Sequence, residues 1–137
     1  MADLKSPAPS RSHGGPLESA FQDFEAGNVD AALDAARAGV TKWPKDSRPL
    51  ALLGLCLAKK GDAVGAISAL RKSLALETRE LGHVLALAEL VAARGETNEA
   101  IALANYVLLK ERDRPELRAQ AQALKSSLAA HAPGDAR

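Results

Sequence analysis

Apolar residues along this chain recur with the period of an α-helix. Leu50, Leu53, Gly54 and Leu57, for example, are spaced i, i+3, i+4 and i+7, which places all four on one face of a helix. Patterns of this kind predict seven helices and no strand. The helices are expected over residues 16–26, 29–42, 47–60, 63–76, 80–94, 97–110 and 115–130.

The helical patterns repeat with a 34-residue step. The step relates three glycines, three polar residues that follow them and three alanines, namely Gly27, Gly61 and Gly95, Asn28, Asp62 and Glu96, and Ala32, Ala66 and Ala100. A glycine can adopt the left-handed conformation that ends one helix, and the polar residue places an oxygen near the exposed N–H groups of the next. A small alanine lets two paired helices approach closely. The repeat therefore predicts pairs of antiparallel helices.

A 34-residue period built from two helices is the length of a tetratricopeptide unit. The sequence resembles that family, and Leu53 and Gly54 match the Leu-Gly pair of its first helix. The resemblance covers residues 16–130. It implies an all-α fold, a right-handed α-solenoid of three tetratricopeptide-like helix-turn-helix repeats followed by a C-terminal capping helix.

The expected repeats cover residues 16–46, 47–80 and 81–114, and the expected capping helix covers 115–130. Within the first repeat, two registers are open. The strict 34-residue step places Ser19 where the second repeat has Leu53, whereas a step of 33 aligns Leu17 with Leu50 and needs a turn one residue shorter before Gly27. We favour the shorter turn.

The two ends of the chain differ in composition from the repeats. Residues 1–15 are rich in Pro, Ser and Gly and offer little apolar surface to bury, so we expect a disordered N-terminal tail. Residues 131–137 are expected to fray in the same way.

Composition and charge narrow the possible partners. The 137 residues carry a formal net charge of +1, and aromatic residues make up only 3 %, so neither a basic surface nor stacking rings favour nucleic acid. No apolar run approaches the roughly 20 residues that span a bilayer, so membrane insertion is not expected. A lone cysteine, Cys56, fits a reducing compartment, and we predict a cytoplasmic protein.

Residues for catalysis or metal binding are scarce. His13, His83 and His131 lie far apart, and none has the spacing of a zinc ligand. Cys56 lies in a leucine-rich helix, where a cysteine usually behaves as a small buried apolar residue. The sequence therefore predicts no catalytic residue, no metal site and no cofactor, and a protein that is not an enzyme.

In the family that the sequence resembles, the first helices of successive repeats line a concave groove. Positions left over after helix packing are the candidate partner-binding residues of this groove: Leu17, Phe21, Phe24, Arg48, Ala51, Leu55, Ala58, Lys59, Leu85, Glu89 and Ala92. The alternative for Leu55 and Leu85 is that they belong to the core between repeats.

Some members of the family bind the C-terminal carboxylate of heat-shock chaperones through a clamp of Lys, Arg and Asn side chains. The corresponding positions here are Leu17, Phe21, Leu52, Gly82 and Ala86, so the resemblance implies no such clamp.

These observations predict a protein-binding module, an adaptor or assembly chaperone whose groove binds an amphipathic or extended apolar segment of another protein. The alternative is a self-assembling protein that forms a homo-oligomer through the N-terminal repeat, with Phe21 and Phe24 at the contact. A type III secretion chaperone is a narrower possibility, suggested by size alone.

Overall fold

The structure is a computed structural model that describes residues 14–77 and 80–131. Over this part of the chain it consists of seven α-helices and contains no strand. The helices are α1 (Gly14–Glu25), α2 (Val29–Lys42), α3 (Ser47–Lys59), α4 (Ala63–Leu76), α5 (Leu81–Ala93), α6 (Thr97–Lys110) and α7 (Pro115–His131).

The helix boundaries agree with the predicted ones to within about two residues. The largest difference is at the start of α1, which begins at Gly14, inside the segment predicted to be a tail. The rest of that predicted tail, 1–13, and the predicted frayed residues 132–137 lie outside the described residues.

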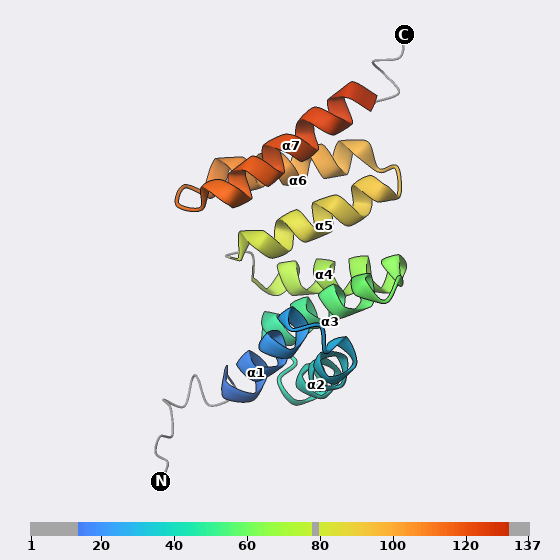
Figure 1. Cartoon of the computed structure of the whole chain (residues 1–137), viewed down its shortest axis with the longest axis vertical. Helices are drawn as coiled ribbons and strands as arrows, with labels where there is room; N and C mark the ends of the chain where they lie inside the picture. The colour runs from blue at the N-terminus through green and yellow to red at the C-terminus, as the bar shows by residue number, and fades with distance from the viewer. Residues whose placement is uncertain (1–13, 78–79, 132–137) are drawn as a thin grey trace.

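The helices are stacked in chain order along the long axis of the molecule, from α1 and α2 at one end to α7 at the other (Figure 1). Each helix packs against the next one in the sequence, α5 also contacts α7, and the first helices of neighbouring repeats touch, α1 against α3 and α3 against α5. The expected array of three helix pairs and a seventh helix is confirmed.

The turn within each repeat depends on a glycine. Gly27, Gly61 and Gly95 have φ angles of 95°, 89° and 85°, in the left-handed region that residues with a Cβ rarely adopt. No other described residue has a positive φ. The three glycines therefore end α1, α3 and α5 in the same way, as the sequence predicted.

Backbone hydrogen bonds in these turns settle the register of the first repeat. The N–H of Asn28 donates to the carbonyl of Asp23 at 2.7 Å. The equivalent bonds of the next two repeats, both 2.9 Å, join Asp62 to Leu57 and Glu96 to Val91. Each pair follows the previous pair by the same 34-residue step, so the first turn has the same length as the others. The favoured step of 33 was wrong.

The predicted helix caps formed at only one of three positions. The side chain of Asp62 accepts a hydrogen bond from the N–H of Gly65 at 2.9 Å, whereas Asn28 and Glu96 make no such bond. The longer Glu96 side chain instead lies 3.7 Å from the guanidinium of Arg71.

Side-chain caps are also present where the repeats begin. Asp46 accepts a hydrogen bond from the N–H of Arg48, and Glu80 accepts one from the N–H of Gly82, each at 2.9 Å. These two acidic residues are 34 positions apart, so α3 and α5 start in equivalent ways.

Small residues lie where paired helices cross. Ala32, Ala66 and Ala100 are fully buried, which confirms their predicted role in close helix contact. Gly54 is packed so closely that a Cβ there would lie 2.7 Å from a side-chain carbon of Leu70. The second helix of each repeat therefore approaches the first at a distance that only small side chains allow.

A cluster of charged residues holds the corner between α6 and α7. Position 112 in this corner is an arginine rather than a proline. The carboxylate of Glu111 accepts hydrogen bonds from the guanidinium of Arg114 at 2.7 and 3.0 Å and from the backbone N–H groups of Asp113 and Arg114, just before α7. Arg114 also contacts Glu80 at 3.1 Å, and Arg118 donates to the carbonyls that end α6. These bonds position α7 against the third repeat.

Removal of residues 115–137 tests whether α7 acts as a cap. Ala121 is fully buried, and Leu117 and Leu124 pack with it against the core of the third repeat, so the shortened chain exposes apolar surface of α5 and α6. We expect it to aggregate or to melt well below the full chain in thermal unfolding followed by circular dichroism. Deletion of residues 1–13 is the control and should leave the melting temperature unchanged. Equal melting temperatures for both deletions would contradict a capping role.

Glu111→Gln is expected to lower stability at neutral pH but not in acid. Hydrogen bonds from the Arg114 guanidinium hold the pKa of Glu111 below the ordinary value of about 4.3. Such a carboxylate stabilises the folded state above its unfolded pKa, and this contribution is lost as the pH falls through the folded pKa. Melting temperatures measured against pH should therefore differ between variant and parent above about pH 5 and converge in stronger acid. Glu116→Gln, at an exposed site on α7, should not differ from the parent.

A gap between Glu111→Gln and the parent that stays constant to the lowest pH would show that the carboxylate acts through packing rather than charge.

Candidate functional site

Three of the predicted groove residues belong to the core. Leu17, Ala51 and Leu85 are 2 %, 1 % and 3 % exposed. They occupy equivalent positions in the three repeats, and there each first helix is covered by its neighbours in a core cluster. The prediction that they contact a partner is therefore corrected, and for Leu85 the alternative of a core residue holds.

Six other predicted residues form two rows at the surface of the first helices. One row contains the partly exposed Phe21 and Leu55 and the exposed Glu89, and the other contains Phe24, Ala58 and Ala92, all partly exposed. Within each row the residues follow the 34-residue step, and neighbouring first helices are in contact. We call these six residues the first-helix surface. Five of them are apolar.

An aromatic contact beside this surface links α1 to α5. The ring of Phe21 on α1 and the imidazole of His83 on α5 are stacked, with centroids 6.2 Å apart and an angle of 13° between their planes. The first repeat therefore touches the third directly.

His83 was not among the predicted site residues. It stands alone in the sequence, and nothing in its neighbours there indicates a ring on another repeat. Burial lowers the pKa of His83, an effect that the nearby Arg114 strengthens and Glu80 opposes. The imidazole that faces Phe21 is therefore neutral at neutral pH.

Arg48 and Lys59 lie at the two ends of α3 and are the basic residues predicted at the edge of the groove. Arg48 is engaged in its own chain, because its guanidinium donates to the carboxylate of Asp46 at 2.7 and 3.1 Å, which raises the pKa of Arg48. Lys59 is exposed to solvent.

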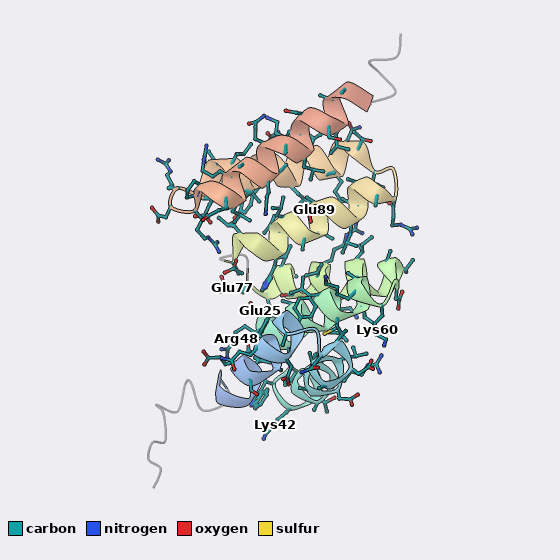
Figure 2. The ribbon with its side chains drawn as sticks, in the orientation of Figure 1. Glu25, Lys42, Arg48, Lys60, Glu77 and Glu89 are labelled. Atoms are coloured by element: carbon teal, nitrogen blue, oxygen red, sulfur yellow. The ribbon has the colours of Figure 1, made fainter. Side chains whose placement is uncertain are left out.

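Arg48 also lines a hollow of about 650 Å³ at the edge of the molecule, outside the first-helix surface. The exposed Leu76 and the partly buried ring of Trp43 form its apolar wall. In Figure 2, Arg48 lies at the opposite edge of the ribbon from Lys60, which marks the other end of α3.

Glu89 is the charged member of the first-helix surface. It lies near the middle of α5 (Figure 2) and forms no ion pair or hydrogen bond with the described side chains around it. Partial burial raises the pKa of its carboxyl group. Its carboxylate is nevertheless exposed to solvent and has no partner among the described side chains.

The residues at the positions of the carboxylate clamp offer no cation. Leu17 and Leu52 are buried, Phe21 stacks on His83, and Gly82 donates its N–H to Glu80. The structure therefore gives an acidic peptide terminus nothing to bind at these positions.

Elsewhere in the described residues, chemistry-bearing groups do not converge. Cys56 is a free thiol, fully buried, and burial raises its pKa. The described residues contain no group of three or more His, Cys, Asp or Glu side chains placed to hold a metal ion. Among the described helices, none is both long and apolar enough to cross a membrane.

No protein-family model and no curated protein sequence matches the chain. Solved structures do. The type III secretion translocator chaperone SycD of Yersinia enterocolitica superimposes with a TM-score of 0.75 at 21% identity, over 93% of this chain and 88% of SycD. PcrH, in complex with the chaperone-binding region of PopD, gives a TM-score of 0.78 at 18% identity, over 96% and 98% of the two chains.

A tetratricopeptide domain superimposes nearly as well. The first such domain of Spaghetti (RPAP3), bound to the HSP90 peptide SRMEEVD, gives a TM-score of 0.71 at 18% identity, over 83% of this chain and 90% of that domain. At these identities the likeness concerns the fold. Together with the seven helices and the 34-residue step, it shows that the described chain has a tetratricopeptide-like helical repeat fold.

Proposed function

We propose that this protein is a non-enzymatic adaptor or assembly chaperone that binds a segment of another protein on the first-helix surface. The observation that carries the proposal is the pair of rows itself. Phe21, Leu55 and Phe24 are large apolar side chains that remain partly exposed on adjacent helices. A continuous apolar surface of this kind is typical of protein interaction sites.

The shape of the rows favours an elongated ligand. The rows cross α1, α3 and α5, of which α3 contacts both of the others, so a bound segment would meet one side chain of each row on each helix. An amphipathic helix or an extended apolar strand presents side chains at regular intervals and suits such a surface. An acidic C-terminal peptide does not, because the clamp positions lack cations and Glu89 would repel it.

The structural neighbours support a peptide ligand. SycD has been solved in complex with a peptide of the translocator YopD, PcrH with the chaperone-binding region of PopD, and RPAP3 with an HSP90 peptide. In three cases, therefore, a protein with this fold has been solved with a segment of another protein bound to it. A secretion-type chaperone is a narrower form of this proposed function. We also propose that the protein is cytoplasmic.

Leu55→Arg tests the surface. Burial of a leucine at an interface contributes about 1.5–3 kcal/mol, so its loss together with the insertion of a charge should weaken partner binding at least tenfold. The side chain is partly exposed in the free protein, and we expect the melting temperature to change by only a few degrees. Pull-down from the source cell with mass spectrometry identifies the partner, and titration of that partner measures the effect.

Two variants serve as controls for Leu55→Arg. Leu109→Arg changes a leucine on α6 that is 64% exposed, and should leave both stability and binding intact. Leu85→Arg buries a charge in the core and should destabilise the fold by several kcal/mol. Full binding by Leu55→Arg would exclude the first-helix surface as the interface.

Self-assembly through the N-terminal repeat is the alternative function. Phe21 and Phe24 both pack against the core cluster of the first repeat, so a dimer formed through them would need to use the exposed parts of the rings. A hollow of about 230 Å³ between α1 and α2, with Ala38 and Trp43 in its wall, is a second place where a copy could insert a side chain.

Light scattering at several concentrations separates the two functions. The adaptor proposal predicts a monomer at every concentration, because the first-helix surface then binds another protein and not a second copy of this chain. A molar mass that rises to that of a dimer, and that Phe24→Ser returns to that of a monomer, would support self-assembly instead.

A further inference from the structure

The first-helix surface has an uneven distribution of charge that bears on its ligand. Of its six residues, Glu89 alone is ionisable, and it occupies in the third repeat the position of Phe21 and Leu55 in the first two. A surface selected only for apolar contact would gain more from a third apolar residue there.

Glu89 has no counter-ion within the described part of the chain, whereas three arginines outside α5 do have acidic partners. Arg48 pairs with Asp46, Arg114 with Glu80 and Glu111, and Arg71 with Glu99 and Glu96. These three arginines are therefore committed to other acids, and Glu89 has no cation partner within the described chain. The carboxylate of Glu89 is exposed to solvent on the first-helix surface, where a ligand can reach it.

We propose that the segment bound on the first-helix surface carries a lysine or arginine between its apolar residues, and that this cation pairs with Glu89. The inference rests on the proposed function, because it identifies the chemistry of the ligand at the same surface. It makes the ligand a basic, apolar segment, opposite in charge to the acidic peptide bound by RPAP3.

The position of Glu89 makes this pair stronger than a pair at the rim. An ion pair between fully exposed groups contributes little, because water screens both charges and the side chains lose freedom. This applies to the exposed Lys59 at the end of α3. Glu89 is exposed in the free protein, but a bound apolar segment would cover it and exclude water, so a cation there would gain a charge-assisted hydrogen bond.

The proposal also predicts how binding depends on pH. Burial raises the pKa of Glu89 in the free protein, and a paired cation would lower it in the complex. Protonation therefore favours the free state, and affinity for a basic ligand should fall as the pH drops through the free-protein pKa. His83 also titrates beside this surface, where its neighbours are Arg114, Glu80 and the uncharged Phe21. Any pH dependence of binding that His83 causes should remain when Glu89 is replaced.

Selection of displayed random peptides by the full chain tests the proposal. Peptides selected by the parent should be apolar with one Lys or Arg, those selected by Glu89→Gln should lose the preference for a basic residue, and those selected by Glu89→Lys should prefer an acidic one. Glu116→Gln, at an exposed site on α7, should select the same peptides as the parent.

Titration of one selected peptide completes the test. Glu89→Gln should weaken its binding about tenfold, the equivalent of about 1.4 kcal/mol, and should abolish the additional loss of affinity that the parent shows in acid. Melting temperatures should differ little, because Glu89 forms no ion pair or hydrogen bond with the described side chains.

Two results would overturn the proposal in different ways. Selected peptides that bind through Leu55 but show no charge preference would exclude the Glu89 pair and leave the adaptor function standing. Failure of the parent to select any peptide whose binding Leu55→Arg abolishes would reject the first-helix surface as a peptide site, and the Glu89 pair with it.

Discussion

Close contact between paired helices at small side chains is the constraint on which this structure depends. Ala32, Ala66 and Ala100 are fully buried at equivalent positions, and Gly54 leaves no space for even a Cβ against Leu70. Helices that approach this closely must keep a fixed axial register, because a shift of one residue would bring a larger side chain into the crossing. The 34-residue step then places every other feature, including the turn glycines, the core positions and the rows of the first-helix surface.

Features determined within a few residues were predictable from the sequence. The left-handed conformation at Gly61 and the small-residue crossing at Ala66 follow from local backbone and side-chain sterics, and both appear where the pattern placed them. Side-chain caps are also local, yet they were predicted less well. A cap depends on rotamer and on competing partners, and Glu96 lies toward Arg71 instead of the start of α6.

Features determined by another repeat were not predictable. Ala51 shares a face of α3 with Leu55, four residues further on, as Leu17 does with Phe21 on α1. Only the position of the neighbouring helices separates the buried member of each pair from the partly exposed one. The register of the first repeat was mispredicted for a different reason. The apolar residues around Leu17 resemble the second repeat more closely at a step of 33, whereas the turn itself, with its backbone bond from Asn28 to Asp23, keeps the step of 34.

The contact between Phe21 and His83 distinguishes this array from an ideal solenoid, in which each repeat contacts only its neighbours. Because the two rings join the first repeat to the third, they restrain the angle between α1 and α5 with α3 between them. A surface whose helices are already restrained loses less conformational freedom when a ligand binds. Phe21 therefore links the first repeat to the third, and in the proposed function it would also offer apolar area to a ligand beside Leu55.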